Sequence, residues 1–95
     1  MHQYNISVQQ VNDFPEGVFR VTVSGGDGET EHTVRVSEEY YQKLTNSNMP
    51  AEELARKSFE FLLEREPKES ILKEFHLPEI QKYFPEYEEE VKKLK

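Results

Sequence analysis

Residues 50–66 read PAEELARKSFEFLLERE, and this stretch decides how the rest of the chain is expected to fold. On an α-helix, its small and apolar side chains would cover about half of the circumference. The other half is charged and suits solvent. One sheet cannot bury so wide a face, so the stretch predicts a central helix that packs against partners on two sides. The positions of the buried half are Leu54, Ala55, Ser58, Phe59, Phe61, Leu62 and Leu63.

Upstream of this helix, three segments alternate apolar and polar residues with the period that a half-buried strand requires. A register that keeps the apolar residues on one face pairs Val8 with Val21 and Phe19 with Val34. His32 then falls at the rim of that face. The sequence predicts a three-stranded antiparallel meander whose apolar face packs on the central helix. The segments are residues 4–8, 19–24 and 32–36, with turn-forming residues at 12–17 and 25–28.

The chain after the meander is expected to be helical. Ser37 is a suitable N-cap for a short helix over 38–44, since its hydroxyl can accept a hydrogen bond from the first turn. Prolines then punctuate the C-terminal third, and a proline inside a helix costs about 3 kcal/mol, so one continuous helix is excluded. Short helices should form instead and cover the second side of the central helix. They are expected over 67–75, over 78–84 and from Pro85 onward, and the first of them would place Ile71, Leu72 and Phe75 together on its inward side.

Composition places these elements in one α+β domain over residues 1–95, with the β-meander in 1–37 and the helical part in 38–95. The formal net charge of −7 opposes binding to nucleic acid and to anionic membranes. The chain has no cysteine, which excludes disulfides and thiol chemistry. It also has no long apolar run, so we expect no membrane span and a cytoplasmic location.

Three motifs in the C-terminal part are distinctive: SFEFLLEREP at 58–67, SIL at 70–72 and YFPEY at 83–87. With them, the stretch from Glu52 to Glu88 resembles a signature of small, uncharacterised bacterial proteins of about this length. The resemblance implies a bacterial, cytoplasmic protein. It carries over no activity, cofactor or site residue, and the N-terminal meander takes no part in it.

Residues that could carry chemistry are scattered along the chain. The glycine-rich stretch Ser24–Gly28 is followed by a strand, whereas a phosphate-binding loop opens onto a helix, so a hairpin turn is favoured. The histidines lack the spacing of a local metal site. Arg20 and Arg35 share the polar sheet face without exposed aromatics, which favours a solvated face over a nucleic-acid platform. We therefore expect no catalytic residue, metal ligand or cofactor. The histidines are His2, His32 and His76.

Two sets of residues are candidates for protein interaction. The first strand is uncharged and would form a sheet edge that can recruit another strand. Several tyrosines could line a partner groove, because they are amphipathic and lose little entropy when ordered, although the rim of the core is the commoner place for them. The candidates are Tyr4, Ile6 and Val8 on the strand, and Tyr40, Tyr41, Tyr83 and Tyr87.

These observations favour a non-catalytic protein-interaction or regulatory module that acts through a protein partner or as a homodimer. The dimer would form through residues 4–11, whose edge carries no charge. The alternative is a small-molecule binding protein or enzyme with a pocket between the central helix and the C-terminal helices. Several convergent polar groups in such a pocket would favour this alternative.

Overall fold

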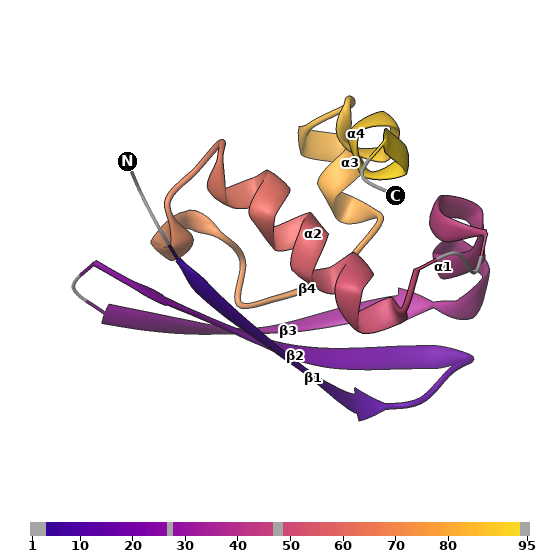
Figure 1. Cartoon of the computed structure of the whole chain (residues 1–95), viewed down its shortest axis with the longest axis horizontal. Helices are drawn as coiled ribbons and strands as arrows, with labels where there is room; N and C mark the ends of the chain where they lie inside the picture. Colours follow the sequence, from indigo (N-terminus) through magenta and orange to yellow (C-terminus); the bar gives the residue numbers. More distant parts are fainter. Residues whose placement is uncertain (1–3, 27, 47–48, 94–95) are drawn as a thin grey trace.

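The alternating N-terminal segments form three long antiparallel strands in the computed structural model, which describes residues 4–26, 28–46 and 49–93 (Figure 1). The predicted register is confirmed, because Val8 pairs with Val21 and Phe19 pairs with Val34. In the turn between the second and third strands, Gly26 has a left-handed φ of 61°, and Asp27 lies outside the described residues. The strands are β1 (Asn5–Asn12), β2 (Glu16–Gly25) and β3 (Gly28–Ser37).

A fourth strand corrects the prediction of a purely antiparallel three-stranded meander. Strand β4 (Glu74–His76) pairs in parallel with β3, so the sheet is mixed and has the order β1-β2-β3-β4. The backbone N–H of Thr33 donates to the Lys73 carbonyl at 2.7 Å, and Leu77 N–H donates to the Arg35 carbonyl at 2.8 Å. These bonds satisfy part of the outer edge of β3.

The prediction of a helix over 67–75 is wrong beyond the first turn. A short 3-10 helix (Lys68–Ser70) follows Pro67, and the chain then runs extended into β4. Phe75 and Leu77 are buried while Glu74 and His76 are exposed, which is the alternation of a half-buried strand. His76 therefore lies on a strand and does not end a helix.

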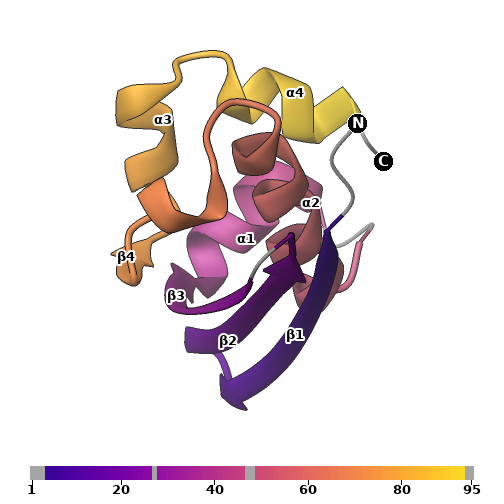
Figure 2. The same cartoon turned by 90° about the vertical axis from the view of Figure 1, so that its left-hand side faces the viewer.

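The helices lie on one face of the sheet (Figures 1 and 2). Ser37 caps α1 as predicted, since its Oγ accepts from the Tyr40 N–H at 3.1 Å. None of the helices in the described part of the chain has the length and apolar character needed to cross a bilayer. The helices are α1 (Glu38–Thr45), α2 (Ala51–Leu63), α3 (Glu79–Tyr83) and α4 (Tyr87–Lys93).

Helix α2 packs on two sides, as predicted. Toward the sheet, the ring of Phe59 lies 6.0 Å from that of Phe75 and 5.1 Å from that of His32. On the other side, the ring of Phe61 meets Phe84 at 5.9 Å and Tyr87 at 5.3 Å. The C-terminal residues therefore complete the core that the sheet begins.

His32 is buried in the sheet and does not sit at the rim. Its Nδ1 lies 2.8 Å from the Leu72 carbonyl oxygen, and its Nε2 lies 2.9 Å from Thr30 Oγ1. Burial lowers the pKa of the imidazole. The neutral ring thus joins β3 to the segment that leads into β4, and both of its nitrogens have partners.

A candidate binding pocket between α2, β4 and α3

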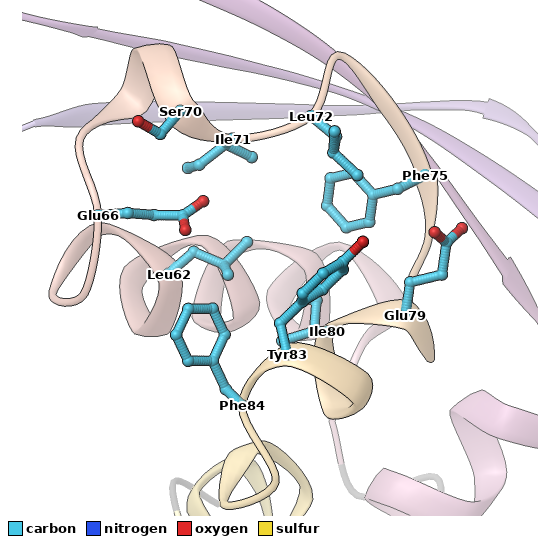
Figure 3. A pocket seen from close by; sticks show the side chains of 10 residues that line it. All are labelled: Leu62, Glu66, Ser70, Ile71, Leu72, Phe75, Glu79, Ile80, Tyr83 and Phe84. Atoms are coloured by element: carbon cyan, nitrogen blue, oxygen red, sulfur yellow. The ribbon is translucent and has the colours of Figure 1, made fainter.

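A pocket of about 390 Å³ opens between α2, the segment that leads into β4, and α3 (Figure 3). Its inner walls are apolar and buried, and they come from Leu62, Ile71, Phe75 and Ile80. Its position is the one that the sequence suggested for a ligand site. The full lining is Leu62, Glu66, Ser70, Ile71, Leu72, Phe75, Glu79, Ile80, Tyr83 and Phe84.

The rim of the pocket exposes apolar side chains to solvent. Leu72 is 51% exposed and Tyr83 is 67% exposed. Within the described residues, Val11 is the other large hydrophobic side chain that is exposed, and it lies on β1 outside the pocket lining. Apolar surface therefore continues from the floor of the pocket onto its mouth.

Two local features shape the walls of the pocket. Because the chain runs extended after the 3-10 helix, Ile71 points into the core while the next residue, Leu72, points out. The side chain of Gln81 holds the turn between α3 and α4: its Nε2 donates to the Pro85 carbonyl at 2.6 Å and its Oε1 accepts from the Glu88 N–H at 2.9 Å. These contacts join α3 to the start of α4.

The charged groups of the lining are two carboxylates at opposite ends. The Glu66 carboxylate points into the pocket between Ile71 and Leu62, while the Glu79 carboxylate lies near Phe75 (Figure 3). Glu79 Oε2 accepts from the His76 N–H at 2.9 Å. Burial raises the pKa of Glu66 above its ordinary value. The pocket thus offers an apolar surface with negative charge and no cationic side chain in its lining.

The lining brings no pair of acid–base groups together. The two carboxyl groups do not face one another across a common point, and no histidine lines the pocket. In the part of the chain that the structure describes, no group of three or more His, Asp or Glu side chains could hold a metal ion. His2 lies outside the described residues.

Of the predicted strand residues, Ile6 and Val8 lie on the inner side of β1, and Tyr4 immediately precedes this strand. Tyr4, Ile6 and Val8 are half-buried and pack against the hydrophobic core. Tyr4 and Ile6 also line a second, more polar groove of about 460 Å³ together with Glu60, Leu63 and Glu64 of the α2 end. The side chain of Leu63 is half-buried and faces this groove.

The four predicted tyrosines do not form one groove. Tyr83 lines the pocket, whereas Tyr87 is fully buried and bonds to Ser58, so it cannot touch a partner. The Tyr40 hydroxyl donates to Glu88 at 2.9 Å, and the Tyr41 hydroxyl donates to the Met49 carbonyl. Tyr87 is a core residue because α4 folds back over α2, an arrangement that short-range patterns do not specify.

Three pocket residues were missed by the sequence reading. Leu72 was assigned to the inward side of a helix, and Glu66 and Glu79 were not singled out. The signal for Leu72 was the alternation of Phe75 and Leu77 with polar neighbours, which indicates a strand through this segment. No sequence pattern marks Glu66, since its direction depends on the turn after α2.

Comparison with known proteins gives no relative from which a role could be transferred. The chain matches no protein-family model, no curated protein and no solved structure.

Proposed function

We propose that the protein is a non-catalytic interaction module that binds an apolar segment of a partner protein in this pocket. The observation that supports the proposal is the continuity between the buried apolar floor and the exposed side chains of Leu72 and Tyr83. A contiguous apolar surface with a tyrosine at its mouth is typical of protein-binding sites. The partner would insert one or two apolar side chains and rest others on the rim.

A protein segment fits the pocket better than a small molecule does. The volume of about 390 Å³ falls in the range of roughly 300–1,000 Å³ that small-molecule sites occupy. Such sites orient their ligand with convergent polar groups, however, and here the two carboxylates lie at opposite ends. A small-molecule site or an enzyme is the alternative function for the same pocket.

The setting that we propose is the bacterial cytoplasm. The resemblance of residues 52–88 to small bacterial proteins and the absence of cysteine support it. Nucleic acid is not the proposed partner. The net charge of −7 opposes it, and Arg35 on the open sheet face is paired with Glu74 at 2.8 Å.

Photo-crosslinking in the native cells tests the proposed function. The photoreactive residue p-benzoylphenylalanine would replace Tyr83 at the rim, and a control protein would carry it in place of Val11, which is 53% exposed on β1. Each protein would also be made with Leu72→Asp, which places a charge on the apolar rim without touching the buried core. Crosslinked peptides would be sequenced by mass spectrometry.

The proposal predicts an adduct to one apolar partner segment from position 83, and loss of that adduct with Leu72→Asp. An adduct that survives Leu72→Asp, or that forms equally from position 11, would show that the pocket is not the binding site. Absence of any adduct at position 83 would also reject the proposal.

A second candidate is self-association through β1, which is the outer strand of the sheet. Its residues Asn5–Asn12 carry no charge, so the edge could pair with a second copy across a two-fold axis. Two features oppose this pairing. Arg56 Nη1 donates to the Ile6 carbonyl oxygen, and the register shifts at a bulge between Gln10 and Asn12. The dimer would need Arg56 to move aside.

Light scattering over a dilution series separates the two candidates. A mass of twice 11.3 kDa that returns to the monomer value with Val8→Pro would support the β1 dimer, since this proline removes a backbone N–H from the open edge and leaves the ladder to β2 in place. A mass of 11.3 kDa at every concentration would reject it.

A further inference from the structure

We infer that the segment bound in the pocket carries a lysine or arginine beside its apolar anchor, and that this cation pairs with Glu66. The inference rests on the proposed function and names the chemistry of the partner. It follows from the position of the Glu66 carboxylate, from the pairing of the neighbouring cations and from the contrast with Glu79.

The Glu66 side chain is placed where a bound apolar group would pass. It leaves the chain just after α2, and its carboxylate points between the side chains of Ile71 and Leu62 (Figure 3). The residue is half-buried, and burial raises the pKa of its carboxyl group. A carboxylate beside apolar walls gains from a cationic partner, because the cation offsets the loss of hydration.

The cations close to Glu66 in the sequence are occupied elsewhere. Arg65 Nε lies 3.1 Å from Glu86 Oε2, and Arg65 Nη1 donates to the Phe61 carbonyl at 3.0 Å. Lys68 Nζ pairs with Glu69. Across residues 4–26, 28–46 and 49–93, no salt bridge reaches Glu66. Its charge is therefore available to a ligand.

Glu79 at the other end of the pocket is less available. Its carboxylate accepts the backbone N–H of His76 at 2.9 Å, a contact that joins β4 to the start of α3. A cation at this end would share an oxygen that already has a structural role. The asymmetry gives the pocket one preferred end for positive charge, which orients the bound segment.

Selection from a random peptide library displayed on phage tests the inference with no assumed partner. The full-length protein would be the target, and its Leu72→Asp variant would be used to discard peptides that bind elsewhere. We expect the retained peptides to combine aromatic or aliphatic residues with a lysine or arginine at a fixed spacing from them.

The outcomes separate the inference from the proposed function. Apolar peptides without an enriched basic residue would keep the pocket as a docking site and reject the role of Glu66. A library from which no peptide depends on Leu72 would reject the proposed function, and the inference with it.

A thermodynamic cycle then assigns the cation to its carboxylate. One retained peptide would be made with its basic residue or with glutamine, and both forms would be titrated against the wild type, Glu66→Gln and Glu64→Gln. Glu64 is the matched control, because its side chain is 77% exposed and does not line the pocket.

We expect the basic residue to strengthen binding to the wild type and to Glu64→Gln by about fivefold or more, as for a partly buried charge pair. With Glu66→Gln the two peptides should bind alike. An undiminished preference for the basic peptide in Glu66→Gln would overturn the inference.

Discussion

The hydrogen bond between Ser58 and Tyr87 fastens α4 to α2, and its removal has a calculable effect. Ser58 Oγ lies 2.8 Å from the Leu54 carbonyl and 2.6 Å from the Tyr87 hydroxyl. A serine hydroxyl has one proton, which it donates to Leu54, so Tyr87 is the donor to Ser58. Tyr87 is fully buried. If the Tyr87 hydroxyl is removed, Ser58 still donates to Leu54. If the Ser58 hydroxyl is removed, the Tyr87 hydroxyl loses its acceptor.

Single substitutions should differ in their effect on the free energy of unfolding. Tyr87→Phe leaves Ser58 bonded to Leu54 and should cost about 0.5–1.5 kcal/mol. Ser58→Ala leaves the buried Tyr87 hydroxyl without an acceptor and should cost about 1–3 kcal/mol. Adding Tyr87→Phe to Ser58→Ala removes the unsatisfied group, so the double variant should be more stable than Ser58→Ala by about 1 kcal/mol.

Urea titration followed by circular dichroism measures these differences, and thermal melts should separate the variants by about 4–8 °C for each kcal/mol. Tyr83→Phe is the control, because its hydroxyl lies at the exposed rim and it should add nothing to Ser58→Ala. A double variant that is less stable than Ser58→Ala would refute the donor assignment and the buried contact between α2 and α4.

Three further predictions use the same titrations and calorimetry. Leu62→Ala should cost about 2–5 kcal/mol and Glu60→Ala less than about 0.5 kcal/mol, because only Leu62 is buried; equal urea midpoints would contradict the assigned face of α2. A peptide bound through a lysine should bind more weakly as the pH falls through the raised pKa of Glu66, since protonation removes its charge; calorimetry with Glu66→Gln should show no such dependence, and a flat wild-type profile would contradict the pairing. His32 has a lowered pKa in the folded state, so the unfolded state binds its proton first and stability should fall as the pH is lowered through 6.5, the ordinary pKa of histidine; a His32→Gln variant with the same pH dependence would count against this.

The meander could be predicted because strands with one buried face leave a period in the sequence. Pairing Val8 with Val21 and Phe19 with Val34 is the choice that keeps the apolar residues together, and the structure has these pairs. The two-sided packing of α2 was predictable for a similar reason, since Phe59 and Phe61 cannot both face one sheet.

Strand β4 could not be predicted with the same certainty. It has only the residues Glu74–His76, and its hydrogen bonds go to β3, about forty positions earlier in the chain. The prolines on both sides indicate that the element between them is short, but they do not distinguish a helix from a strand. The predicted helix placed Leu72 on an inward-facing side, whereas the structure places it at the solvent-exposed rim. The sequence therefore indicated a pocket between α2 and the C-terminal helices but not its shape.

The different burial of Tyr83 and Tyr87 could not be predicted from the sequence pattern. Tyr83 and Tyr87 are tyrosines only four residues apart in the sequence. The structure buries Tyr87 completely and leaves Tyr83 67% exposed, because the turn at Pro85 points α4 back over α2. Which tyrosine is available to a partner is thus decided by a change of chain direction, which periodicity does not report.

The most direct test of the account is to locate a bound peptide by NMR on methyl-labelled protein. With a peptide retained in the Leu72-dependent selection, intermolecular nuclear Overhauser effects should join its apolar side chain to the methyl groups of Leu72 and Ile80 in the pocket. Overhauser effects to Ile6 and Leu63 instead, at the groove beside β1, would contradict the claim that the pocket between α2, β4 and α3 is the binding site.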